Sequence, residues 1–174
     1  MNKNNKFNIN DLLDNVCKDL LTVMKQSDIE DPVMVGIHSS GYLIAKRLHE
    51  MLKIEEPLGA LNSSFYRDDF SRIGLHPQTK PSQLPFDLEN KHIILVDDVL
   101  YTGRTIRAAM NELFDYGRPA SITLAVLMDR TGARELPIEA QVVGTREKLD
   151  TDNYCRIEEQ NGKLTLDIIH RDEK

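Results

Sequence analysis

The chain has 174 residues, of which 40% are hydrophobic and 29% charged, a composition typical of one soluble globular domain. The net charge of -6 does not favour a general electrostatic attraction to nucleic acid, and two cysteines far apart indicate neither a disulfide framework nor a zinc site. Residues 1–10 lack the apolar stretch of a secretory signal, and no apolar run approaches the roughly 18 residues that span a bilayer, so we expect a cytoplasmic protein with no membrane partner.

Apolar periodicity predicts helices and strands that alternate along the chain. The first half is predicted to contain a loose tail over 1–10, a helix over 11–27, a strand over 33–37, a loop over 38–41, a helix over 42–54 and a strand over 58–66. Residues 11–174 form a single predicted domain. The proline-containing segment 67–85 is too long for an ordinary connection, which indicates a functional segment, a disordered segment or a small β-hairpin arm.

The second half continues the same alternation. It is predicted to contain a strand over 92–96, a turn over 97–104, a helix over 105–116, a strand over 122–128, a polar loop over 129–135, a strand over 141–144 and a hairpin over 155–169. The hairpin turns at Asn161 and Gly162, a strong two-residue turn signal. Strands that are apolar on both faces predict an α/β fold with a doubly wound parallel sheet. Ligands of such sheets bind beyond the carboxyl ends of the strands, which points to the loops 38–41, 67–85, 97–105 and 129–139.

Residues 93–105 carry the clearest chemical signal. A buried strand ends in two acids, and a short turn with hydroxyl, glycine and arginine residues opens a helix: Asp97, Asp98, Thr102, Gly103, Arg104 and Thr105. Backbone amides at a helix N-terminus favour an anion, and carboxylates suit sugar hydroxyls or a hydrated divalent metal. The segment therefore predicts a site for a phosphorylated ribose. The alternative is that Asp97 caps the turn and the threonines cap the helix.

This segment resembles the phosphoribosyl-pyrophosphate (PRPP) motif of the type I phosphoribosyltransferases, and more narrowly the version in the PyrR family of pyrimidine operon regulators and uracil phosphoribosyltransferases. Further matching blocks bring the resemblance to roughly residues 33–145, namely Tyr66-Arg67-Asp68-Asp69, Leu84-Pro85-Phe86-Asp87, Tyr116-Gly117-Arg118-Pro119-Ala120, Asp129-Arg130 and Arg134-Glu135-Leu136-Pro137-Ile138.

The resemblance implies a role for each loop. Asp97 and Asp98 would hold the ribose hydroxyls and face Mg²⁺ bound with PRPP, while the chain itself supplies no separate metal site. Residues 102–105 would bind the 5′-phosphate, with Asp98 and Arg104 as the catalytic candidates. The remaining implied assignments are Ser39, Ser40 and Gly41 for pyrophosphate, Arg67 for the mobile arm that closes over substrate, and Asp129, Arg130 and Val143 for uracil, largely through backbone groups.

Three functions follow from the resemblance. The first is a uracil phosphoribosyltransferase that converts uracil and PRPP to UMP and pyrophosphate. The second is a nucleotide-sensing regulator that binds pyrimidine operon RNA with weak or no transferase activity; the acids Asp11, Asp14 and Asp19 on the first helix argue against RNA binding. The third is a transferase for a purine base, which ranks last because the block at residues 134–138 resembles that of the PyrR family. The family likeness also implies a homodimer or homotetramer.

Overall fold

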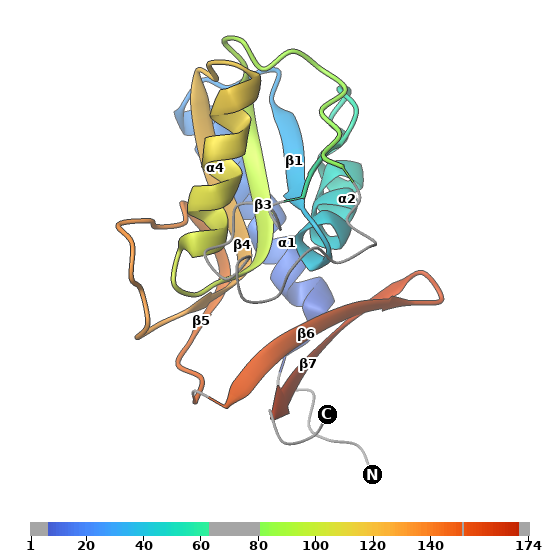
Figure 1. Ribbon diagram of the computed structural model, residues 1–174. Coiled ribbons are helices and arrows are strands. Elements are labelled where there is room, and N and C mark those ends of the chain that lie inside the picture. The colour runs from blue at the N-terminus through green and yellow to red at the C-terminus, as the bar shows by residue number, and fades with distance from the viewer. Residues whose placement is uncertain (1–6, 63–80, 151, 171–174) are drawn as a thin grey trace.

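The computed structural model describes residues 7–62, 81–150 and 152–170 (Figure 1). Its elements in chain order are α1 (Ile9–Gln26), β1 (Val33–Ile37), α2 (Ser40–Leu52), β2 (Gly59–Leu61), β3 (His92–Leu100), α4 (Arg104–Tyr116), β4 (Ser121–Arg130), β5 (Val142–Glu147), β6 (Asn153–Gln160) and β7 (Lys163–His170). The predicted α/β fold with a parallel sheet and a C-terminal hairpin is confirmed. Most of the predicted arm, including Arg67, lies outside the described residues.

Five strands form one parallel sheet in the order β2-β1-β3-β4-β5. The chain leaves β1 through α2 and returns as β2 on one side, whereas β3 lies on the other side of β1. The strand order therefore reverses between β1 and β3, and the loops that follow these two strands border the crevice where such sheets bind ligands.

Helices cover both faces of the sheet, as a doubly wound fold requires (Figure 1). α1 and α2 pack on one face, where Val16 and Ile44 meet Met34 and Ile94. The opposite face packs against α4 and holds a second apolar cluster that includes Val35, Leu95, Ile106 and Leu113. Alternate residues of β1 and β3 thus enter opposite clusters, which explains why these strands read as continuous apolar runs. None of the helices in the described ranges is long and apolar enough to cross a membrane.

Several element boundaries differ from the sequence prediction, and two of the differences have a clear physical cause. α1 begins at Ile9, inside the predicted tail, because the Asn8 side chain caps the helix by accepting a hydrogen bond from the Asn10 amide at 3.0 Å and Ile9 is buried. β3 continues through the predicted turn at Asp97 and Asp98 to Leu100. Residues 97–100 pair with residues 126–129 of β4, and this pairing overrides the local preference of two adjacent acids for a turn.

The C-terminal hairpin joins β6 and β7 at the predicted turn, where Asn161 and Gly162 both have positive φ, at 52° and 74°. Its residues Ile157 and Leu166 are buried in the same cluster as α1 and α2. In Figure 1 the hairpin (red) crosses the end of the molecule at which the parallel strands finish. It therefore lies on the same side as the loops expected to bind a ligand.

Candidate active site

The loop after β1 lies directly against the first acid of β3. Gly41 stands in the first turn of α2, and a Cβ atom there would lie 2.9 Å from the Cα and Oδ1 atoms of Asp97 and from the carbonyl oxygen of Val96. Only a glycine permits this approach without displacing the strand. The structure therefore brings together two segments that are far apart in sequence, 38–41 and 97–98, as the PRPP-site prediction requires.

The two adjacent acids at 97 and 98 are held by the backbone. Asp97 is only 5% exposed, and its Oδ1 accepts a hydrogen bond from the Asp98 amide at 2.9 Å. Asp98 is half-buried, and its Oδ1 accepts from the Val99 amide at 2.7 Å. Each carboxylate is thus oriented by the residue that follows it. Oxygen ligands of this kind suit the hydroxyls of a sugar or a hydrated Mg²⁺.

Burial raises the pKa of the Cys155 thiol to about 12, with further contributions from the negative charges of Asp98 and Asp167. Of the two acids in β3, Asp98 is the one whose charge acts on this thiol. The thiol is therefore protonated and unreactive near neutral pH. Cys155 serves as a small apolar residue that packs the hairpin against the core cluster of α1 and α2.

The turn between β3 and α4 has the shape of an anion-binding loop. Gly103 adopts a φ of +93° immediately before α4, a left-handed conformation that favours glycine. The Thr102 hydroxyl accepts a weak hydrogen bond from the Arg104 amide at 3.3 Å. The N-terminus of α4 therefore begins at the crevice, where its dipole favours a phosphate. Thr105 follows in the first turn of the helix, so residues 102–105 lie together as predicted.

A second loop, residues 134–138, packs against this turn. The backbone amides of Glu135 and Leu136 both donate to the Thr102 carbonyl oxygen, at 3.0 and 3.2 Å. A Cβ atom at Gly103 would lie 3.4 Å from the Cβ atoms of Leu136 and Ile138. In addition, Nε of Arg104 donates to Oε2 of Glu135 at 2.6 Å. Sequence reasoning treated residues 134–138 only as a family signature and did not predict this contact.

Asp129 at the end of β4 is a buried acid with two cationic partners. It is 6% exposed, and its Oδ1 accepts a hydrogen bond from Arg134 at 2.5 Å while Oδ2 lies 3.7 Å from Nε of Arg146. The same Arg134 guanidinium donates to the Tyr101 carbonyl oxygen at 2.6 Å. Arg134 therefore links the end of β4, predicted to lie beside uracil, to the start of the turn between β3 and α4, predicted to bind phosphate.

The other two residues predicted to bind uracil occupy different environments. Arg130 stacks on the Tyr101 ring at 4.1 Å, and its guanidinium donates to the carbonyl oxygens of Asp150 and Asn153 at 2.6 and 3.0 Å. Its donors are thus directed to the segment that enters the hairpin. Val143 is half-buried in β5 beside Val126 of β4. The assignment of these residues to uracil stays a prediction.

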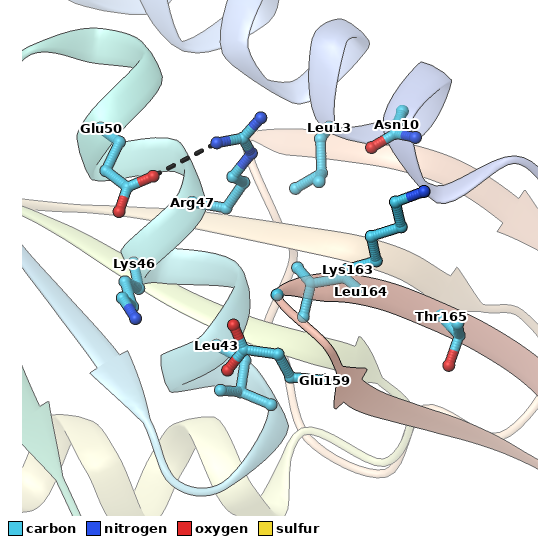
Figure 2. Close-up of a pocket in the computed structure, with 11 residues that line it drawn as sticks. Asn10, Leu13, Leu43, Lys46, Arg47, Glu50, Glu159, Lys163, Leu164 and Thr165 are labelled. Carbon is cyan, nitrogen blue, oxygen red and sulfur yellow. Dashed lines mark hydrogen bonds and ion pairs between the residues drawn. The ribbon is translucent and has the colours of Figure 1, made fainter.

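A separate cavity of about 510 Å³ lies between α1, α2 and the hairpin (Figure 2). Lys46, Arg47 and Lys163 line it together with Glu50 and Glu159, and Arg47 forms an ion pair with Glu50 at 3.2 Å. None of the predicted site residues lines this cavity. The described residues also contain no group of three or more His, Cys, Asp or Glu side chains that could hold a metal ion.

Comparisons with known proteins agree with this geometry. The family model described as "Phosphoribosyl transferase domain" matches residues 6–157. A hypoxanthine-guanine phosphoribosyltransferase from Bacillus anthracis superimposes with a TM-score of 0.68 over 88% of this chain and 85% of that chain, at 17% identity. A hypoxanthine phosphoribosyltransferase from Staphylococcus aureus gives a TM-score of 0.64 over 85% and 80% of the two chains, at 21% identity. The match to this family model and the fold therefore define a protein of the phosphoribosyltransferase class.

Curated relatives narrow the assignment. "Bifunctional protein PyrR" of Nitrosococcus oceani is 58% identical over 140 residues, which cover 79% of this chain and 78% of the relative. The protein of the same name from Pseudomonas paraeruginosa is 54% identical over 147 residues, or 84% of this chain and 86% of the relative. The chain belongs to the PyrR family of phosphoribosyltransferases, so the family and enzyme class predicted from the sequence are confirmed.

Proposed function

We propose that this protein transfers the phosphoribosyl group of PRPP to uracil, giving UMP and pyrophosphate. The observation that carries the proposal is the contact between the two loops of the crevice, where Gly41 lies against Asp97 and Gly103 immediately precedes the helix α4. A ligand with a phosphate at one end, a diol in the middle and a pyrophosphate at the other matches these three positions in order. PRPP is such a ligand.

In this mechanism the chain mainly binds and orients the substrate. The amides and hydroxyls of residues 102–105, with Arg104, hold the 5′-phosphate, and Asp97 and Asp98 accept hydrogen bonds from the ribose hydroxyls. Ser39, Ser40 and Gly41 would face the pyrophosphate as its bond to C1 of the ribose lengthens. The negative charge of Asp98 favours the cationic sugar that develops. Mg²⁺ bound with PRPP would supply charge neutralisation for the leaving pyrophosphate, and the carboxylate oxygens of Asp97 and Asp98 would suit a hydrated Mg²⁺.

Asp129, Arg130 and Val143 would form the uracil side of the crevice. Asp129 lies at the carboxyl-terminal part of β4, next to Leu100 of β3, which supports this position. Val143 is the second residue of β5 and pairs with Val126 in the middle of β4, so its place beside uracil has less support. Because the Asp129 carboxylate is already bound by Arg134 and the Arg130 guanidinium binds carbonyl oxygens of the hairpin entrance, backbone groups of these residues are the better candidates for contacts to the base. Arg67 would contribute from the arm.

The test is an assay with the full chain, labelled uracil, PRPP and Mg²⁺, in which UMP should form. Hypoxanthine and guanine in parallel reactions should give no nucleotide. Asp97→Asn preserves the oxygen that accepts from the Asp98 amide but removes the charge, and should lower kcat/KM by roughly 10- to 100-fold. Asp31→Asn, an exposed acid at the opposite end of the sheet, should have no effect. Absence of UMP with folded protein that binds PRPP would exclude the proposal.

Regulation through RNA is the second candidate, because the curated relatives are named bifunctional. The exposed acids Asp11, Asp14 and Asp19 of α1 disfavour that surface as the contact, so another face is the better candidate for binding the RNA. A gel shift with a pyrimidine leader RNA, with and without UMP, tests this function. Light scattering would test the proposed homodimer or homotetramer, and cell fractionation the cytoplasmic location.

A further inference from the structure

The segment Arg134-Glu135-Leu136, here called the brace, is the part of the family signature to which the proposed reaction assigns no role. It lies in the loop after β4, yet its contacts are with the phosphate loop after β3. Two of its amides donate to the Thr102 carbonyl oxygen, and Arg134 donates to the Tyr101 carbonyl oxygen at 2.6 Å. The brace therefore contacts the two residues that lead into Gly103.

Glu135 adds a side-chain contact on the other side of Gly103. Its Oε2 atom accepts a hydrogen bond from Nε of Arg104 at 2.6 Å, while its own amide donates to Thr102 at 3.0 Å. One residue thus holds both neighbours of Gly103. Because Glu135 is fixed through its backbone, its carboxylate offers Arg104 a fixed partner.

Electrostatics makes the location of this acid informative. A carboxylate beside an anion site repels the anion, so its presence there needs a compensating effect. A guanidinium carries five N–H donors in a rigid planar fork, and a bond through Nε fixes its plane without using all of these donors. The repulsion between the Glu135 carboxylate and the phosphate is therefore compensated if Glu135 orients the Arg104 guanidinium toward the phosphate.

We propose that Glu135 is a positioning residue for the 5′-phosphate of PRPP: it holds Arg104 in the orientation in which the guanidinium contacts the phosphate, while the brace fixes the loop on which Arg104 stands. This inference rests on the proposed function, because it assigns residues 102–105 to the phosphate of PRPP. Glu135 acts through Arg104 and does not touch the substrate.

The experiment compares Glu135→Ala and Glu135→Gln with the unmodified full chain. The matched control is Glu139→Ala, since Glu139 is an exposed acid in the same loop. Steady-state kinetics with PRPP and uracil, calorimetric binding of PRPP with Mg²⁺, and thermal unfolding are measured for each. The ion pair is half-exposed, with the two side chains 47% and 49% accessible, so its loss should leave the melting temperature almost unchanged.

For Glu135→Ala we expect the KM and Kd for PRPP to rise about three- to fivefold, the factor that corresponds to an exposed charged pair, with kcat and the KM for uracil unchanged. Glu135→Gln should recover most of the affinity, because its amide oxygen can accept from Nε of Arg104. Glu139→Ala should match the unmodified chain.

Three results would overturn the inference. Unchanged PRPP affinity in Glu135→Ala would show that the pair has no role in binding. Tighter PRPP binding would show that Glu135 competes with the phosphate for Arg104. A joint loss of kcat, affinity and melting temperature without recovery in Glu135→Gln would show a purely structural role. If the unmodified chain itself binds no PRPP, the proposed function fails first and this inference fails with it.

Discussion

Replacing Gly103 by alanine tests the phosphate loop most directly, because the backbone there has a φ of +93°. Holding an L residue in a left-handed conformation costs about 1–2 kcal/mol, and the lower entropy of the unfolded chain offsets about 0.4–1 kcal/mol of this. The new Cβ would lie 3.4 Å from the Cβ atoms of Leu136 and Ile138, which is close contact without severe overlap. We therefore expect a net loss of about 1 kcal/mol, or roughly 2–4 °C in melting temperature for a chain of this size.

The functional effect should be larger than the loss of stability. A loop that relaxes to relieve the strain at Gly103 moves the amides of residues 102–105, and these amides are the proposed phosphate donors. The KM for PRPP should rise at least about tenfold, since charge-assisted hydrogen bonds depend strongly on geometry. The assay combines thermal unfolding with initial rates at varied PRPP and saturating uracil.

Gly132 provides the matched control. Its φ is +96°, almost the same as that of Gly103, and a Cβ there would meet nothing within 4 Å. Gly132→Ala should therefore lose the same stability but keep the KM for PRPP. If Gly103→Ala kept its KM within about twofold of the unmodified chain while both variants lost stability equally, the assignment of this loop to the phosphate would be wrong.

Three further predictions concern buried groups. Burial is the main cause that raises the pKa of Glu112, so the free energy of unfolding should fall as pH rises from the ordinary pKa of 4.5 through the folded-state pKa. Glu112→Gln should remove this loss, which urea unfolding at several pH values would measure. Equal pH profiles for the variant and the unmodified chain would refute the prediction. Arg130→Met should lower the free energy of unfolding by about 2 kcal/mol and speed amide hydrogen exchange in β6, because the Asn153 carbonyl oxygen loses its donor. Unchanged hydrogen exchange in β6 would contradict this prediction. Burial raises the pKa of the Cys155 thiol to about 12. At pH 8 this thiol should therefore react with iodoacetamide far more slowly in the folded chain than in the unfolded chain, as mass spectrometry would show. Equal rates in the two states would contradict its burial.

The sequence predicts strands and turns correctly where a single sequence pattern is strong and no other pattern conflicts with it. β1 and β4 are apolar on both faces, and the turn at Asn161 and Gly162 specifies the hairpin. The predicted end of β3 was wrong because local and tertiary preferences disagree there. Asp97 and Asp98 favour a turn in isolation, but β4 continues alongside them and pairs with residues 97–100. A single sequence does not show the length of the neighbouring strand.

The phosphate loop is recognisable for a related reason. Its residues are contiguous, so spacing alone places Asp97, Asp98 and Gly103 near one another. The brace contacts the loop across about 30 positions of sequence, as the ion pair between Arg104 and Glu135 illustrates. Only the pairing of β3 with β4 brings the loops after these strands together. A motif search therefore finds the site residues that are contiguous in sequence and misses those that only the folded chain brings together.

Arg130 illustrates the same limit for the direction of a side chain. The family resemblance implies that Arg130 contacts uracil largely through backbone groups, and the sequence does not indicate where the Arg130 guanidinium points. The guanidinium binds carbonyl oxygens of Asp150 and Asn153, about 20 residues later in the chain. Buried carbonyl groups need donors, and the segment entering the hairpin obtains them from Arg130. The hairpin thereby depends on the same strand that ends at the proposed base site, so a variant at Arg130 must be judged by stability before it is judged by catalysis.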